Sequence, residues 1–155
     1  MPPEVYLRPL TIEDANDVYV SWLNDPIVTK YLETKSSTME QLREYVAKHL
    51  RRTDCVLLGI FVRPTDTFIG TVKIHDIVRS SGEAQFGMMI GDREYWGKGV
   101  GTLVTSLAAR YAFRDLDLSR LKLGVMVENE AAVRAWWDTV PDRVNRAGRS
   151  GIISA

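Results

Sequence analysis

Three glycines at alternate positions, Gly97, Gly99 and Gly101, stand directly before a segment with the periodicity of a helix. Apolar residues recur in that segment at three- and four-residue spacing, at Leu103, Val104, Leu107, Ala108 and Tyr111. The first N–H groups of a helix have no partner within it, and the helix dipole makes that end positive. Because glycine has no Cβ to keep an anion from the backbone, the turn from Gly97 to Thr102 predicts a phosphate or pyrophosphate site. A flexible turn without a ligand is the alternative.

The composition limits the partners of such a site. We expect one domain over residues 1–155, which is long enough for a sizeable core. Basic and acidic residues balance at 20 each, so neither nucleic acid nor an anionic membrane surface is an expected partner. No apolar tract approaches the ~20 residues that span a membrane, and no secretory signal is visible, so we expect a cytoplasmic protein. Cys55 and the two histidines give no metal-site spacing.

The elements around the glycine turn predict an α/β fold. Turn signals of hairpin length at 64–66 and 80–82 join three strands into an antiparallel meander. The order strand, helix, strand that follows implies a parallel pair. We therefore expect a mixed sheet with helices on both faces. The expected strands are 5–10, 55–62, 68–78, 84–90 and 120–127, and the expected helices are 11–23, 27–32, about 38–50, the glycine turn to about 116, and 130–138.

A dinucleotide-binding fold also places a glycine-rich turn between a strand and a helix. Glu128 even ends the strand 120–127, where such folds carry an acid that binds ribose. However, the third glycine of that motif would fall on Thr102, and the residues 92–96 separate the strand from the glycines. A P-loop is excluded because no Gly-Lys-Ser/Thr follows at the required distance. A nucleotide-dependent oxidoreductase is therefore the less favoured alternative.

Two segments about thirty residues apart carry a family resemblance. They are Tyr95-Trp-Gly-Lys-Gly-Val-Gly-Thr102 and Val127-Glu-Asn-Glu-Ala-Ala-Val-Arg134, and they resemble the GNAT superfamily of acetyl-CoA-dependent N-acetyltransferases. The segments 7–14, 22–26 and 68–72 are similar to its branch of ribosomal-protein N-terminal acetyltransferases and related small-amine and amino-sugar acetyltransferases. The resemblance covers roughly residues 5–137. It implies acetyl transfer from acetyl-CoA to a primary amine of a protein N-terminus, a small amine or an amino sugar.

The resemblance also implies where coenzyme A would bind. The family pattern Gln/Arg-x-x-Gly-x-Gly/Ala falls on Trp96, Gly99 and Gly101, with a departure at the first position. The turn would hold the pyrophosphate, the end of the preceding strand would lie along the pantetheine arm, and Asn129 would lie near the thiol. The implied cofactor-binding residues are Met88, Met89, Ile90, Trp96, Gly97, Lys98, Gly99, Val100, Gly101, Thr102 and Asn129. A solvated surface role is the alternative for Lys98, and a helix N-cap for Asn129.

The implied reaction needs a neutral amine, a hydrogen bond to the thioester oxygen and a proton for the thiolate. A strand N–H near Met89 can donate the hydrogen bond. Many relatives carry a tyrosine that protonates the thiolate, and that position is Trp136 here, whose indole N–H is not a practical acid. His75 and Glu83, at strand ends, are candidate bases, and exposed strand positions without a catalytic role are the alternative. The candidate catalytic residues are therefore His75, Glu83 and Trp136.

The last segment, 139–155, is atypical. It is rich in Arg, Gly and Ser and lacks periodicity before Ile152, so we predict no strand there. The family continues with two more strands after its last helix, so we expect the C-terminal strands to be shortened or missing. An uncovered sheet edge invites pairing, which predicts a homodimer. The tail and Trp136 leave a second function open, that of a degenerate acyl-CoA-binding protein without turnover.

Overall fold

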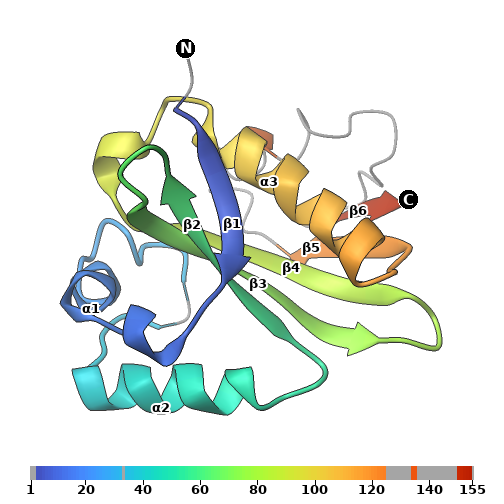
Figure 1. The fold of residues 1–155 in the computed structure, drawn as a ribbon, viewed down its shortest axis with the longest axis horizontal. Helices are drawn as coiled ribbons and strands as arrows, with labels where there is room; N and C mark the ends of the chain where they lie inside the picture. Colours follow the sequence, from blue (N-terminus) through green and yellow to red (C-terminus); the bar gives the residue numbers. More distant parts are fainter. Residues whose placement is uncertain (1–2, 33, 125–133, 136–149, 155) are drawn as a thin grey trace.

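The computed structural model describes residues 3–32, 34–124, 134–135 and 150–154. Six strands form one sheet in the order β1-β2-β3-β4-β5-β6 (Figure 1). They are β1 (Val5–Pro9), β2 (Val56–Val62), β3 (Thr67–Val78), β4 (Glu83–Ile90), β5 (Arg120–Gly124) and β6 (Ser150–Ser154). Neighbouring strands are antiparallel, except that β4 and β5 run parallel. The predicted mixed sheet, antiparallel first and then with a parallel pair, is confirmed.

Helices cover both faces of this sheet (Figure 1). In the continuously described residues 3–32 and 34–124, the helices are α1 (Asp17–Leu23), α2 (Met39–Leu50) and α3 (Val100–Arg110), and the short helical turns are η1 (Ile12–Asp14), η2 (Arg93–Tyr95) and η3 (Tyr111–Asp115). One core cluster lies between the sheet and α3, with Val104 and Ala108 fully buried. A second cluster joins Trp22 of α1 and Val46 of α2 to Met89 of the sheet. The turn η3 continues α3 toward residue 116, as predicted.

Helix α2 begins where the sequence predicts. The side chain of Thr38 accepts a hydrogen bond from the Gln41 N–H at 3.1 Å, and the Gln41 side chain accepts one from the Thr38 N–H at 2.9 Å. This reciprocal pair satisfies two N–H groups that the first helical turn leaves unpaired.

The segment 27–32 forms turns rather than the predicted helix. The Asp25 carboxylate accepts a hydrogen bond from the Ile27 N–H at 2.9 Å. The Lys35 ammonium donates to the carbonyls of Thr29, at 2.6 Å, and Lys30, at 2.9 Å. Side chains thus bond backbone groups that a helix would use, which explains why the prediction is wrong here.

The C-terminal tail contains a strand, contrary to the sequence-based prediction. Strand β6 pairs antiparallel with β5, with Leu121 opposite Ile153 and Leu123 opposite Gly151. Pairing with a distant strand depends on tertiary context, which the local composition of residues 139–155 does not report. The end of the expected strand at 125–127, and nearly all of the expected helix 130–138, lie outside the described residues.

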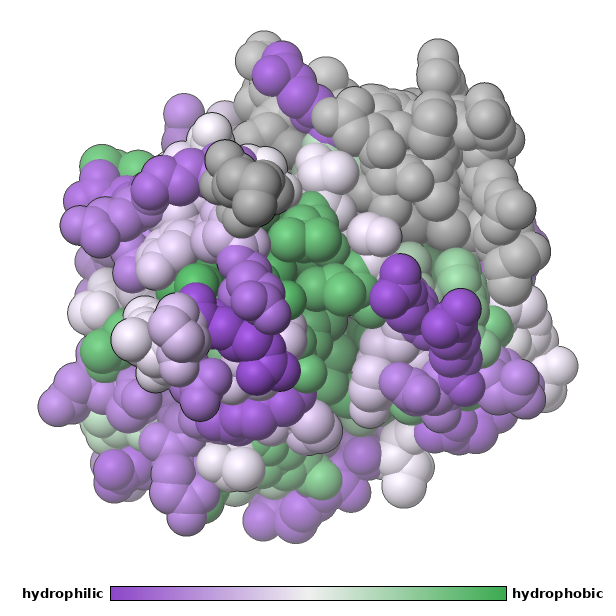
Figure 2. Space-filling view, turned by 45° about the horizontal axis from the view of Figure 1, so that its top comes forward, coloured by the Kyte–Doolittle hydropathy of each residue, from purple (hydrophilic) through white to green (hydrophobic). Residues whose placement is uncertain are grey.

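The surface combines hydrophobic and hydrophilic areas. On the face shown in Figure 2, a band of hydrophobic side chains lies between hydrophilic areas. Trp96, next to the glycine turn, is one of the large hydrophobic side chains that are exposed, at 42%. Within the described ranges, no helix has both the length and the apolar character required to cross a bilayer.

Candidate functional site

Strands β4 and β5 run side by side over only part of their length. Their parallel pairing joins residues 83–85 to residues 120–122. Strand β4 continues to Ile90 and stays paired with β3 throughout, with Gly70 opposite Ile90. From Gly87 to Ile90, no pairing with the described part of β5 is present. Within this stretch, the family resemblance places the pantetheine arm of coenzyme A along Met88 to Ile90.

The glycine turn has the backbone conformation that an anion site requires. Gly97 and Gly99 have φ values of 74° and 77°, in the left-handed region that favours glycine. Among the residues that the structure describes, no atom lies within 4 Å of a Cβ added at either position, so the backbone is open on this side. Helix α3 begins at Val100, and the Leu103 N–H closes its first turn by donating to the Gly99 carbonyl at 3.2 Å. The turn therefore fits a pyrophosphate at the positive end of a helix.

Two contacts fix this turn to the end of β4. The Trp96 Nε1–H donates to the Ile90 carbonyl at 2.8 Å. A Cβ built on Gly101 would lie 3.7 Å from Met88 Cε and 3.5 Å from the Ala135 Cβ, in ordinary contact. The structure thus brings the cofactor residues predicted on β4 together with those predicted on the turn. The family resemblance placed Trp96 among the implied cofactor-binding residues but did not predict this contact, because an indole bond to a backbone carbonyl leaves no sequence signal.

Charged side chains surround the turn on two sides. The Lys98 ammonium lies 5.7 Å from the centroid of the Tyr95 ring and is exposed. Arg93, in η2, forms an ion pair with Asp25, with 3.3 Å between Nε and Oδ2. A shallow recess of about 620 Å³ lies beside this pair and is lined by Trp22, Gly91, Asp92, Arg93 and Glu94. The pair therefore links the segment that follows α1 to the turn that follows β4.

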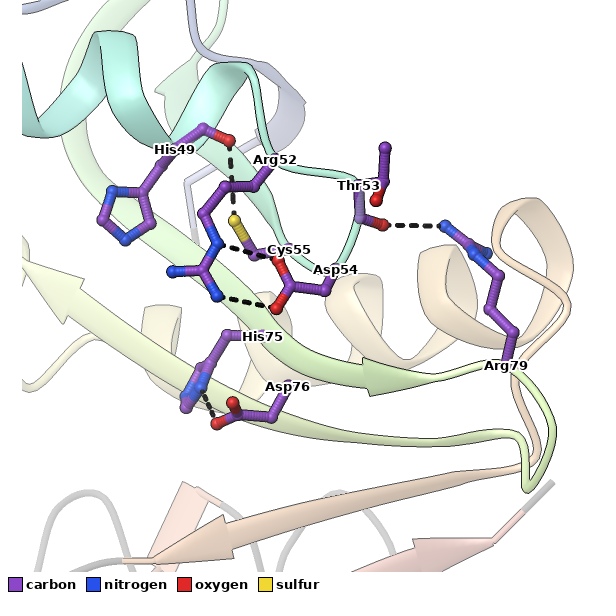
Figure 3. A network of polar contacts seen from close by, with 8 residues as sticks. All are labelled: His49, Arg52, Thr53, Asp54, Cys55, His75, Asp76 and Arg79. Carbon is purple, nitrogen blue, oxygen red and sulfur yellow. Dashed lines mark hydrogen bonds and ion pairs between the residues drawn. The ribbon is translucent and has the colours of Figure 1, made fainter.

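His75 lies on β3, opposite Gln85 of β4, where β4 and β5 end their pairing. Its side chain is 29% exposed, and its Nδ1 is 2.8 Å from Oδ2 of Asp76 (Figure 3). An ionised carboxylate only accepts hydrogen bonds, so Nδ1 donates to Asp76, and in the neutral form of the ring Nε2 then keeps the lone pair. Figure 3 also shows a second ion pair nearby, in which Arg52 holds Asp54 through two hydrogen bonds of 2.8 and 2.6 Å. The arrangement leaves His75 Nε2 able to accept a proton.

Glu83 lies at the other end of β4, roughly 23 Å along the strand from Ile90. Its carboxylate is 3.0 Å from an Arg120 nitrogen and 2.9 Å from the Lys122 ammonium. The hydrogen bond from Lys122, together with the charges of both cations, lowers the pKa of Glu83. A lower pKa makes a carboxylate a weaker base, so this environment favours a role for Glu83 in joining β4 to β5.

The remaining predicted site residues, Asn129 and Trp136, lie outside the described residues. The structure also draws attention to two residues that sequence analysis did not single out, Lys73 and Gly87. They lie opposite each other on β3 and β4. The alternation of inward and outward residues along β3 indicates which face Lys73 lies on. It does not show which residue of β4 lies opposite, because strand register is not visible in that pattern.

A family model described as an acetyltransferase (GNAT) domain matches residues 4–136. The chain belongs to this family. Its membership confirms the predicted superfamily, the enzyme class and acetyl-CoA as the acetyl donor. The single parallel pair of the described sheet also differs from the doubly wound sheet of the alternative, a dinucleotide-dependent oxidoreductase. The narrower assignment to the ribosomal-protein N-terminal acetyltransferase branch stays a prediction.

Several N-acetyltransferases resemble this GNAT protein. The spermidine N(1)-acetyltransferase of Escherichia coli (strain K12) is 30% identical over 132 residues, which are 85% of this chain and 69% of that protein. The uncharacterized N-acetyltransferase YoaA of Bacillus subtilis (strain 168) is 28% identical over 132 residues, which are 83% and 73% of the two chains. The crystal structure of spermidine N-acetyltransferase from Vibrio cholerae, in complex with CoA and spermine, has a TM-score of 0.86 at 22% identity and covers 97% of this chain and 95% of that chain. This last match shows that the fold is shared.

Proposed function

We propose that this protein transfers the acetyl group of acetyl-CoA to a primary amine, carried by a small molecule or by a protein N-terminus. The observation that carries the proposal is the open, left-handed turn at Gly97 and Gly99, which is fixed directly to the end of β4. Relatives named for an amine acceptor, spermidine, support the acceptor class.

The binding roles follow from the position of each group. The N–H groups of Gly97, Gly99 and Val100 would bind the pyrophosphate, and Lys98 would add a positive charge beside it. The edge of β4 from Met88 to Ile90 would bind the pantetheine arm. These groups would hold the thioester near the point at which β4 leaves β5.

The reaction forms a C–N bond between the amine and the acetyl carbon and breaks the C–S bond to coenzyme A. A strand N–H near Met89, on the edge of β4 that faces away from β3, would donate to the thioester oxygen, which gains negative charge as the amine attacks. His75 would accept, through bridging water, the proton that the nitrogen loses, because Asp76 holds its Nδ1–H and leaves Nε2 as the base. The thiolate would take a proton from water, since Trp136 supplies no practical acid. Asn129 would contact the donor near its thiol end.

Release of the coenzyme A thiol tests this function. The purified protein, acetyl-CoA and one amine at a time (spermidine, glucosamine or a peptide with a free N-terminus) should release thiol, and mass spectrometry should find the acetylated amine. His75→Asn, which keeps a polar side chain without a usable base, should lower kcat by roughly a hundredfold and leave acetyl-CoA affinity unchanged. Acetyl-CoA binding without any acetylated product would contradict transfer and favour the degenerate acyl-CoA-binding alternative.

Self-association remains part of the proposal. The prediction of a homodimer came from an uncovered sheet edge, yet β6 lies next to β5 and occupies that edge. Size-exclusion chromatography with light scattering should give twice the 17.5 kDa mass of the chain for a homodimer.

A further inference from the structure

A half-buried lysine, Lys73, lies on the face of the sheet that α2 covers. On β3 its neighbours Val72 and Ile74 enter the core on the α3 side, so Lys73 projects from the opposite face. Its ammonium nitrogen lies 5.5 Å from the centroid of the Tyr45 ring of α2. Within the part of the chain that the structure describes, Lys73 takes part in no salt bridge. Its charge is therefore available to a ligand on this face.

The positive charge of Lys73 acts on a side chain of α2, that of His49. Burial lowers the pKa of His49, and the positive charge of Lys73 contributes to the same lowering. The ring of His49 lies 4.1 Å from the ring of Tyr45, centroid to centroid. The cation thus lies beside the Tyr45 ring, which in turn contacts the ring of His49.

Open space lies directly across from Lys73. Its partner on β4 is Gly87, and a Cβ added there would meet no atom of the described residues within 4 Å. Side chains of directly opposed residues lie about 5 Å apart, so the Lys73 side chain borders this space. Gly87 directly precedes Met88, the first residue of the β4 stretch that is proposed to bind the donor. The open space therefore borders both the cation and the start of that stretch.

The proposed base borders the same space. His75 is two residues beyond Lys73 on β3 and projects from the same face, roughly 7 Å along the strand. An amine near His75 would leave the rest of a small acceptor molecule within reach of Lys73. The spacing suits an acceptor whose amine and second polar group are a few bonds apart.

We propose that the acceptor is an amine that carries an anionic group, a carboxylate or a phosphate, which Lys73 binds while the amine lies near His75. The inference rests on the proposed function and names the acceptor class of the same site. A carboxylate or phosphate would form a charge-assisted hydrogen bond with the ammonium ion. A second ammonium group of a polyamine would instead meet a like charge. The acceptor thus differs in charge from spermidine, for which a relative is named.

Matched pairs of acceptors test the proposal. The carboxylate pair is 4-aminobutyrate and 4-aminobutanamide, the phosphate pair is glucosamine 6-phosphate and glucosamine, and spermidine is the polycationic probe. For each pair, kcat/KM for the anionic amine is divided by kcat/KM for the neutral one. In Lys73→Met this ratio should fall by at least roughly tenfold relative to the wild type for the pair that matches the natural acceptor. Comparing the ratio between proteins cancels the different basicities of the amines.

Three further variants complete the test. Lys73→Arg keeps the charge and should keep the preference, and Lys73→Gln is a second neutral variant in case Lys73→Met does not fold. Lys48→Met removes an exposed charge from α2 and should leave the ratio unchanged. The acceptor class would be overturned if the neutral variants gave the same ratio as the wild type. It would also be overturned if the wild type preferred spermidine or the neutral amines. Either result would leave acetyl transfer standing. Absence of turnover with every amine would overturn the proposed function, and the acceptor class with it.

Discussion

Two pairs of glycines near the end of β4 differ in what surrounds them. One pair is Gly70 and Gly91, and the other is Gly97 and Gly99 of the turn. A Cβ on Gly70 would overlap a backbone oxygen, and a Cβ on Gly91 would overlap the ring of Trp22. A Cβ on Gly97 or Gly99 would meet nothing within 4 Å in the described part of the chain. The first pair is required by the packing of the chain itself. The second pair leaves the backbone open, as a site for a ligand requires, and so the two groups separate the needs of the fold from those of binding.

Backbone conformation sharpens this comparison. Gly97 and Gly99 have positive φ values, whereas Gly70 and Gly91 do not. A positive φ costs other residues roughly 1 kcal/mol or more. An open turn in the left-handed conformation directs consecutive N–H groups toward one point, which suits an anion. Substitutions in the first group should therefore affect folding, and substitutions in the second should affect affinity.

Gly70→Ala should give the largest effect. The added methyl group would collide with the Met89 carbonyl and with Ile90 Cα, and backbone atoms cannot rotate away as a side chain can. We expect a loss of about 3 kcal/mol in the free energy of unfolding, which lowers Tm by about 6–12 °C. Differential scanning calorimetry measures both. An unchanged Tm would show that the close contact at Gly70 does not hold.

Gly99 offers a matched pair of variants for the binding site. Asp and Asn are similar in shape, and both tolerate the left-handed region better than most residues. Gly99→Asp should weaken acetyl-CoA binding by at least roughly a hundredfold, because its carboxylate faces the pyrophosphate, and Gly99→Asn by less than about tenfold. Isothermal titration calorimetry measures both affinities. Equal losses in the two variants would mean that charge at the turn is irrelevant and that no phosphate binds there.

Trp96→Phe should weaken the link between the glycine turn and β4, and it should reduce acetyl-CoA binding less than Gly99→Asp does. The change removes the hydrogen bond to the Ile90 carbonyl but keeps an aromatic ring. A net hydrogen bond is worth about 1 kcal/mol, so KM for acetyl-CoA should rise about fivefold with little change in kcat. Steady-state kinetics with varied acetyl-CoA checks this. A lower kcat at an unchanged KM would assign Trp96 a role in the chemical step instead.

Gly87→Ala should have the smallest effect on stability. Gly87 has open space beside it, like the turn glycines, but not their positive φ. The free energy of unfolding should rise by about 0.5 kcal/mol, since alanine reduces the freedom of the unfolded chain. Turnover should fall by roughly tenfold, because the methyl group enters the space proposed for the acceptor. Stability and amine kinetics measured on the same sample check both; unchanged kinetics would place the acceptor elsewhere.

The local parts of this structure could be predicted from sequence. Hydrophobic spacing and turn residues define the meander, the glycine turn and α3, because neighbouring residues decide them. The capping box of Thr38 and Gln41 is local in the same way. The turns of residues 27–32, where the helix prediction was wrong, also depend on local hydrogen bonds, those of Asp25 and Lys35.

The parts that depend on register could not be predicted. Strand β6 exists because it pairs with β5, and its own composition is that of a loop. Lys73 and Gly87 lie opposite each other only through the register of β3 and β4. The bond from Trp96 to Ile90 joins residues six apart through a backbone carbonyl. The candidate cofactor residues of β4 and the glycine turn lie close together in sequence and could be named from it, whereas Lys73 and Gly87 could not.

The central claim is that the glycine turn binds the pyrophosphate of acetyl-CoA, and a thermal-shift titration tests it most directly. The wild-type chain should be stabilised by acetyl-CoA, by ~2.7 kcal/mol at a hundred times the dissociation constant, with no comparable shift from NAD or ATP. Gly99→Asp should lose this shift and Gly99→Asn should largely keep it. A folded wild-type protein that shows no shift with acetyl-CoA, or an equal shift with NAD, would contradict the account.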